Sequence, residues 1–269
     1  MAIPTMRNKT KVLILFCLFL FSCPFLKADY YEGVPLFQSY EKIDLTMLPQ
    51  FLPYNPTILE AGAFNGNETV RAAKLWPRGR VIAFEPNPQA YEGLEKTIAE
   101  SGVENVETYP QAFSLYNGSA TFHVCLGMKG DEPAFGYASS LLPTTQEMAI
   151  YCQGPQIKVP CVILDDWCKA RRIKKIDLLR LELEGMELPV LQSSPNILKT
   201  VKIIYLKTLI HPHRVNMTNY TELKTFLEKS NFVLLAHRYT PGIIGHAIFL
   251  SRELFDAYFK LSLGMYLEY

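Results

Sequence analysis

The chain has 269 residues, of which 49% are hydrophobic, 20% charged and 12% aromatic, and its formal net charge is +1. Apolar content this high excludes an intrinsically disordered protein, and the length accommodates one large domain or two small ones. Residues 1–28 contain four basic and no acidic residues, so the remainder, from Asp29 onward, has a net charge of −3. Nucleic-acid-binding proteins usually have a basic excess, and we therefore expect no nucleic-acid partner.

The N-terminus has the features of a secretory signal peptide. Residues 1–11 carry three positive charges, residues 12–26 form a mostly apolar run, and the small residue Ala28 precedes Asp29. As a helix this run is about 22 Å long, whereas a bilayer core is roughly 30 Å thick. We expect residues 1–28 to be a cleaved signal peptide. An uncleaved membrane anchor through residues 12–26 and a lipid-modified Cys23 are the alternatives.

The positive charges precede the apolar run, so a signal peptide and an anchor both place the body of the protein on the non-cytoplasmic side. We expect an exported or membrane-associated protein, or a cytoplasmic one if translation starts downstream. Four cysteines follow the leader: Cys125, Cys152, Cys161 and Cys168. In an exported chain they can form disulfides, and ordinary semi-buried thiols are the alternative. They contain no C-x-x-C pair, and we expect no metal site.

From residue 57 onward, short apolar segments alternate with amphipathic ones, which is typical of a parallel sheet with helices on both faces. The predicted strands are residues 57–62, 80–85, 106–113, 176–183, 201–209, 232–239 and 243–250. The predicted helices are residues 66–76, 88–100, 186–193 and 219–229, with a short one through Ala170 that Asp165 or Asp166 caps. Pro241-Gly242 indicates a final antiparallel hairpin, and residues 252–268 are amphipathic.

Residues 114–164 interrupt this alternation. They are rich in glycine and contain strand-like segments at residues 120–125 and 157–164, which indicates an inserted β-hairpin region and not a separate domain. We expect a single α/β, Rossmann-like domain over residues 29–269, built on a mostly parallel seven-stranded sheet.

The turn after the first predicted strand reads Glu60-Ala-Gly62-Ala-Phe-Asn-Gly66. Gly62 permits a sharp turn, and Gly66 leaves room for a ligand at the start of the helix. Phe64 stands in place of the middle glycine of the dinucleotide-binding fingerprint, which disfavours a nicotinamide-dependent reductase. By itself the motif is more typical of a structural turn than of a ligand site.

The ends of the next two strands carry further polar and aromatic candidates. Glu85 lies 23 residues after Gly62, where a carboxylate can accept hydrogen bonds from ribose hydroxyls. An exposed strand-end carboxylate or a helix cap is the alternative interpretation. Gln111 and Phe113 end the third predicted strand, within reach of an adenine ring.

Several segments together resemble the FkbM-type methyltransferases, a family of class I S-adenosylmethionine-dependent O-methyltransferases. They are ILEAGAFNGNET, VIAFEPNPQAYEGLEK, NVETYPQAFS, and VILDDW followed by DLLRLELEGMELPVL. The resemblance covers about residues 55–195 and continues more loosely to about residue 250. It implies S-adenosylmethionine as cofactor, with Glu60, Gly62 and Gly66 around its methionine part. It also implies Glu85 and the adjoining Asn87 at the ribose, and Gln111 and Phe113 near the adenine.

The chain departs from the family pattern at the catalytic end. Glu60 replaces the usual aspartate, Arg180-Leu-Glu182-Leu-Glu184-Gly185 replaces K-I-D-V-E-G, and Lys207 replaces a common acid. Methyl transfer depends mainly on positioning donor and acceptor, and a hydroxyl acceptor also benefits from a general base. Strand alternation places Glu182 and Glu184 on one side, as candidates for that base, a substrate ligand or a metal ligand.

Other interpretations of these residues stay open. Glu184 is alternatively a cap of the following helix, with Glu187 only adding charge to its first turn. His211 or His213 is a candidate base, with an ordinary surface-loop histidine as the alternative. Ser139-Ser140 matches a serine pair of the family and is expected to line the acceptor pocket.

The sequence predicts an S-adenosylmethionine-dependent methyltransferase that acts on a hydroxyl of a small molecule or glycan. The alternative is an exported, methyltransferase-like binding module that has lost catalysis, which the altered Arg180, Glu182 and Lys207 would fit.

Overall fold

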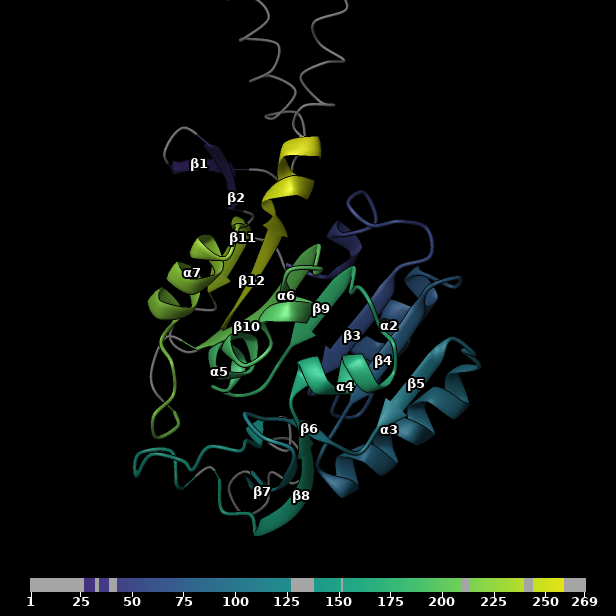
Figure 1. The fold of residues 1–269 in the computed structure, drawn as a ribbon. Coiled ribbons are helices and arrows are strands. Elements are labelled where there is room, and N and C mark those ends of the chain that lie inside the picture. Colours follow the sequence, from purple (N-terminus) through teal and green to yellow (C-terminus); the bar gives the residue numbers. More distant parts are fainter. Residues whose placement is uncertain are drawn as a thin grey trace, which may run out of the picture.

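The computed structural model describes residues 27–31, 34–38, 43–126, 138–150, 152–209, 213–239 and 244–258. Most of the expected signal peptide therefore lies outside the described residues. Within them, no helix is long and apolar enough to cross a bilayer. The central element is a seven-stranded sheet with the order β11-β12-β10-β9-β3-β4-β5 (Figure 1).

The strands of this sheet agree with most of the predicted segments. They are β3 (Thr57–Ala61), β4 (Arg80–Phe84), β5 (Val106–Tyr109), β9 (Leu178–Leu181), β10 (Ile203–Leu209), β11 (Phe232–Tyr239) and β12 (Ile244–Ser251). Neighbouring strands are parallel except for β12, which is antiparallel to both β10 and β11. The predicted Rossmann-like fold with a C-terminal antiparallel hairpin is confirmed. The turn predicted at Pro241-Gly242 lies outside the described residues.

Helices cover both faces of the sheet (Figure 1). One face carries α2 (Asn67–Leu75), α3 (Pro88–Ser101), the 3-10 helix η1 (Leu45–Met47) and a helix at residues 252–258. The other carries α4 (Leu164–Ala170), α5 (Glu187–Gln192), α6 (Pro195–Leu198) and α7 (Tyr220–Lys229). Because the sheet is buried on both sides, its strands are apolar almost throughout.

Side-chain caps determine where several helices begin. Asn219 and Glu222 form the predicted capping box of α7. The predicted cap of α4 is wrong, because its N-cap is Ile163, which makes no side-chain capping bond. Asp165 instead accepts hydrogen bonds from the backbone N–H groups of Asn196 and Ile197, and so stabilises the start of α6, a helix that the periodicity did not indicate.

The third predicted strand is also corrected. Residues 106–113 do not form one strand, because Pro110 has no N–H group and the chain turns there, with the Gln111 N–H donating to the Tyr109 carbonyl. The second half, β6 (Ala112–Phe113), belongs to a small separate sheet. That sheet has the order β6-β8-β7 and contains the predicted insertion strands as β7 (Gly118–His123) and β8 (Gln156–Val162), paired antiparallel.

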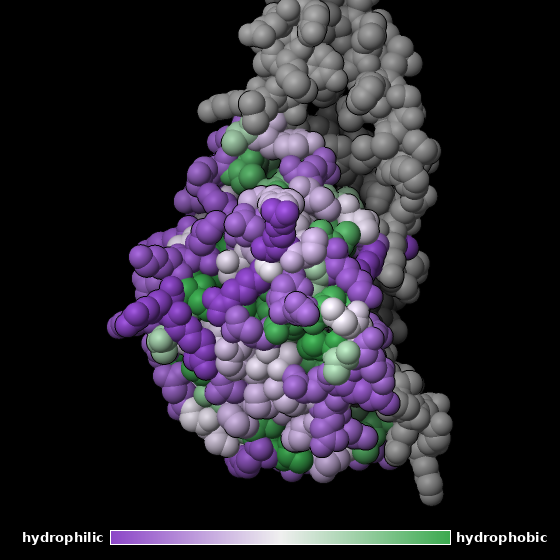
Figure 2. Space-filling view, turned by 90° about the vertical axis from the view of Figure 1, so that its right-hand side faces the viewer, coloured by the Kyte–Doolittle hydropathy of each residue, from purple (hydrophilic) through white to green (hydrophobic). Residues whose placement is uncertain are grey.

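An N-terminal hairpin was not predicted from the sequence. Its strands are β1 (Lys27–Tyr31) and β2 (Val34–Gln38), and β2 lies against β11. β1 includes the expected cleavage boundary at Ala28. On the side of the molecule shown in Figure 2, hydrophilic residues dominate the surface and hydrophobic ones occur in small, separate patches, as is usual for a globular domain.

Candidate active site

A pocket lies where the carboxyl ends of β3, β4 and β9 meet the insertion. Its lining includes Gly62, Glu85, Gln111, Phe113, Ser139 and Glu182. Open α/β sheets bind ligands at this edge, because neighbouring strand ends and the loops that follow them leave a crevice there. The pocket brings together four of the seven predicted cofactor residues, one predicted catalytic residue and one residue of the serine pair.

The glycine turn is tightly fitted against β9. Gly62 has a φ of 85°, and a Cβ added to it would lie 2.2 Å from the carbonyl oxygen of Glu182. Only glycine therefore fits this turn. Phe64, at the position of the missing middle glycine, also adopts a left-handed conformation with a φ of 49°. Its N–H donates to Glu85 Oε2 at 2.8 Å, which links the turn to the end of β4.

Glu85 is a buried carboxylate that faces the pocket. Besides the bond from Phe64, its Oε1 accepts from the Asn87 N–H at 2.8 Å. Burial raises the pKa of Glu85, and the two backbone hydrogen bonds lower it. Burial has the larger effect, so the pKa is about 7. A carboxylate has about four acceptor sites, so acceptor capacity remains for hydroxyl groups of a ligand.

The opposite part of the pocket fits an aromatic ring that carries an amino group. Phe84 and Phe113 supply apolar walls, with ring centroids 4.4 Å apart. Gln111 Oε1 is buried and has no hydrogen-bond partner within the described residues. A buried acceptor without a partner is costly, and an amino group on a bound ring would satisfy it. Together with Glu85, these residues fit an adenosine group.

Glu60 lies below the pocket floor and does not face it. Its carboxylate is buried and accepts from Thr69 Oγ1 at 2.6 Å and from Arg180. Arg180 also donates to Glu182, so one buried guanidinium joins two carboxylates. Burial raises the pKa of Glu60, whereas Arg180 lowers it in part. Within this network, Glu182 is the acid that lines the pocket.

Glu184 does not share the orientation expected from strand alternation. β9 ends at Leu181, and Glu184 adopts a left-handed conformation with a φ of 52°. Its carboxylate forms a buried ion pair with Lys207 on β10. Burial opposes the charge on Lys207, but Glu184 and Glu182 outweigh it and raise the pKa of the lysine. Glu184 therefore neutralises Lys207 and does not line the pocket.

The carboxylate that binds the loop backbone is Glu187. It accepts from the N–H groups of Leu183 at 2.7 Å and Gly185 at 2.9 Å. Glu184 is not the cap of α5, whose N-cap is Met186 without a side-chain capping bond, and Glu187 does more than add charge to the first turn. Burial raises the pKa of Glu187 to about 7.

Two predicted cofactor residues have structural roles in this geometry. Gly66 is the N-cap of α2, and a Cβ there would lie 2.7 Å from Leu94 Cδ1, so its glycine permits the close packing of α2 against α3. Asn87 Oδ1 accepts from the Gln89 N–H and caps α3. Neither residue lines the pocket.

The family to which the chain belongs follows from a comparison with known protein families. Residues 60–234 match the model of the methyltransferase FkbM domain, which is more than half of the chain. The chain is an FkbM methyltransferase. The segments of this family noted in the sequence lie at the pocket just described, and S-adenosylmethionine, the expected cofactor, is the methyl donor of this family.

Relatives of this FkbM methyltransferase include two named methyltransferases. It is 25% identical over 181 residues to 2-O-methyltransferase NoeI of Sinorhizobium fredii, covering 66% of this chain and 73% of the relative. It is 26% identical over 158 residues to methyltransferase sdnD of Sordaria araneosa, covering 52% of this chain and 61% of the relative. A similar solved structure is the N-terminal domain of EvdMO1 in the presence of SAH and D-fucose, with 12% identity, a TM-score of 0.45 and coverage of 92% and 97%.

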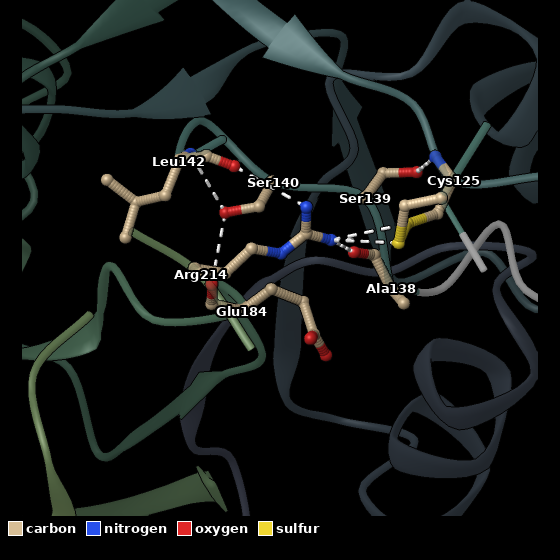
Figure 3. Close-up of a disulfide and its surroundings, with 8 residues drawn as sticks. Cys125, Ala138, Ser139, Ser140, Leu142, Glu184 and Arg214 are labelled. Atoms are coloured by element: carbon tan, nitrogen blue, oxygen red, sulfur yellow. Dashed lines mark hydrogen bonds between the residues drawn. A yellow bond between two sulfur atoms is a disulfide. The ribbon is translucent and has the colours of Figure 1, made fainter. Parts of the chain in front are cut away.

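The insertion beside the pocket of this FkbM methyltransferase is crosslinked. Cys125, which follows β7, forms a disulfide with Cys152, whereas Cys161 and Cys168 are free and buried. The Cys125 N–H donates to Ser139 Oγ at 3.0 Å. In Figure 3 the Arg214 side chain lies between this disulfide and Leu142, and its guanidinium donates to the Ala138 carbonyl. The disulfide and Arg214 thus hold Ser139 at the pocket.

The sequence did not indicate the histidine that the structure places near these acids. His211 lies outside the described residues, so its predicted role stays a prediction. His246 on β12 lies beside Glu182, with Nε2 3.9 Å from Oε1. Its alignment with Lys207 across β10 and β12 depends on strand pairing, which no local motif in the sequence indicates.

Proposed function

We propose that this FkbM methyltransferase transfers the methyl group of S-adenosylmethionine to a hydroxyl oxygen of a small molecule or glycan. The observation that carries the proposal is the single pocket that contains Glu85, Gln111 and Glu182. Glu85 and Gln111 suit the adenosine part of the donor, and Glu182 lies next to the turn at Gly62. The name of the relative NoeI, a 2-O-methyltransferase, agrees with oxygen as the acceptor atom.

The residues of the chain have distinct tasks in this reaction. Bound S-adenosylmethionine supplies an electrophilic methyl group on a good leaving group, so the protein mainly has to align the two reactants. Glu85 would hold the ribose hydroxyls, and Gln111 the amino group of the adenine. Ser139 and Leu141, from the insertion, close the pocket over the acceptor side and exclude water. Glu182 provides a negative charge where the acceptor hydroxyl binds.

An exported location is part of the proposal. The disulfide between Cys125 and Cys152 supports it, since disulfides persist in oxidising compartments and are rare in the cytosol. Glu184 bears on the alternative function, a binding module without catalysis, because its ion pair with Lys207 leaves one acid fewer for the reaction.

Two measurements test the proposal. Calorimetry should show that the protein binds S-adenosylmethionine. Glu85→Ala should weaken this binding by about tenfold or more, because charge-assisted hydrogen bonds to the ligand are lost. No binding at millimolar donor would refute the proposal. Transfer of a labelled methyl group to a panel of glycosides and small alcohols then identifies the acceptor. Donor binding without transfer to any hydroxyl would favour the binding module.

A further inference from the structure

His246 lies near the start of β12, between β11 and β10, and its side chain is partly exposed. Its side chain is 35% exposed, whereas its neighbours Ala247 and Ile248 on β12 are fully buried. The ring packs edge-on against Tyr205, with centroids 5.7 Å apart. One ring nitrogen, Nε2, faces Glu182 Oε1, and Nδ1 has no hydrogen bond within the described residues. The imidazole thus faces Glu182 through one nitrogen, and its ring is only partly buried.

Glu182 itself is a poor base. Burial raises the pKa of Glu182, but Arg180, Lys207 and His246 oppose this and together hold it below its usual value. The carboxylate therefore stays ionised and has little tendency to take up a proton. What it does supply is a fixed negative charge beside His246, which stabilises an imidazolium as one forms.

We infer that His246 is the base that accepts the proton of the acceptor hydroxyl, and that Glu182 is the residue that positions it. The inference rests on the proposed function. In the step, the hydroxyl oxygen forms a bond to the methyl carbon as the carbon–sulfur bond breaks, and the electron pair of that bond goes to sulfur. The hydroxyl proton passes to the imidazole. One positive charge is present before and after, first on sulfur and then on His246.

The surroundings of His246 keep it neutral until the reaction. Burial lowers the pKa of His246, Glu182 counteracts this, and Arg180 and Lys207 lower it further. The charged or titratable groups near it come from α2 (Glu68), β9 (Arg180), the residue after β9 (Glu182), β10 (Tyr205, Lys207) and β11 (His237, Arg238). A neutral imidazole is the form that accepts a proton, so the base is available at neutral pH.

The link between His246 and Glu182 is tested without any acceptor. NMR of the histidine ring protons, with the His246 signal assigned by its loss in His246→Gln, gives the pKa of this residue. Removal of the neighbouring charge in Glu182→Gln should lower that pKa by about one unit or more. An unchanged pKa would overturn the positioning role of Glu182.

The catalytic role is tested by turnover with an acceptor found in the glycoside and alcohol panel. His246→Gln should lower kcat about 100-fold and leave the affinity for S-adenosylmethionine unchanged. In the unaltered protein kcat should fall as the pH drops through the pKa of His246, and Glu182→Gln should move this fall to lower pH. His246→Gln should abolish the fall.

Two further variants separate the outcomes. His237→Gln is the matched control, since His237 is on the neighbouring strand but stacks on Tyr220 at the opposite face of the sheet; it should keep kcat and its pH dependence. His211→Gln tests the competing candidate, and loss of the acidic fall in this variant alone would overturn the inference. Absence of donor binding contradicts the proposed function, whereas donor binding with full turnover in His246→Gln contradicts only the role of His246.

Discussion

The backbone of Gly62 lies directly against the carbonyl oxygen of Glu182, with no space for a side chain between the end of β3 and the end of β9. This contact places the first turn of the donor pocket next to the acid at its acceptor side. The ends of β3 and β9 are therefore packed backbone against backbone, in addition to the ion pairs that Arg180 forms with Glu60 and Glu182.

Gly62→Ala should consequently damage both stability and donor binding. The added Cβ clashes with the Glu182 carbonyl, and the φ of 85° is unfavourable for alanine, so we expect a loss of about 3 kcal/mol or more in the free energy of unfolding. Gly102→Ala is the matched control. Gly102 has a φ of 70°, but a Cβ there meets nothing within 4 Å, and the loss should be about 1 kcal/mol. Equal losses in urea unfolding would contradict the close contact.

The affinity for S-adenosylmethionine should depend on the ionisation of Glu85. The pKa of Glu85 is about 7 in the folded protein, and hydroxyl donors bind better to the ionised form. We therefore expect the affinity to rise as the pH increases through about 7, as calorimetry can measure. Glu85→Gln should bind more weakly and lose this dependence. A pH-independent affinity in the unaltered protein would show that Glu85 does not contact the donor.

The same carboxylate affects stability in the opposite direction. Its pKa is higher in the folded protein than the 4.5 of an unperturbed glutamate, so the folded state holds an additional proton between these pH values. Stability from this group is present below about pH 4.5 and is lost as the pH rises through about 7. The decrease in the free energy of unfolding with rising pH should be smaller in Glu85→Gln, as urea unfolding at several pH values will show.

Lys207 and Glu184 should behave as a coupled pair. Their side chains are 6% and 5% exposed, and removal of one partner leaves an unpaired buried charge. Lys207→Met or Glu184→Gln alone should each cost about 3–5 kcal/mol, and the double variant much less than the sum. Additive losses in the double-mutant cycle would show that the two residues do not interact.

The disulfide should stabilise the insertion and the acceptor side. Its cysteines are 27 positions apart, for which the loss of chain entropy in the unfolded state corresponds to about 3.5 kcal/mol. Reduction by a dithiol, or the variant Cys125→Ser/Cys152→Ser, should lower the midpoint of thermal unfolding. Cys161→Ser should leave the response to the dithiol intact. A double variant that unfolds at the same temperature as the unaltered protein would contradict a stabilising crosslink.

Local signals were enough to predict most of the fold. Apolar runs such as Thr57–Ala61 and Arg80–Phe84 ended at glycine or proline turns, and the box formed by Asn219 and Glu222 marked the start of α7. The site candidates Gly62, Glu85, Gln111 and Phe113 followed from their places at the ends of consecutive strands, which parallel pairing brings to one edge.

The features that were missed depend on contacts distant in sequence. His246 and Lys207 are neighbours because β12 pairs with β10, and the carboxylate of Glu184 is drawn to Lys207 by burial of both charges. The turn at Pro110 illustrates a different error. Residues 106–113 were predicted as one strand, although proline has no N–H group to donate to a neighbouring strand.

The position of β12 determines when the protein is able to finish folding. This strand is synthesised after all the others but occupies the interior of the sheet, between β10 and β11. Until the ribosome has released it, β10 presents a free row of backbone N–H and C=O groups along its length, and β11 has no strand to pair with in the sheet. The sheet of the nascent chain therefore remains incomplete, with unpaired strand edges that chaperones can protect, until β12 has been synthesised.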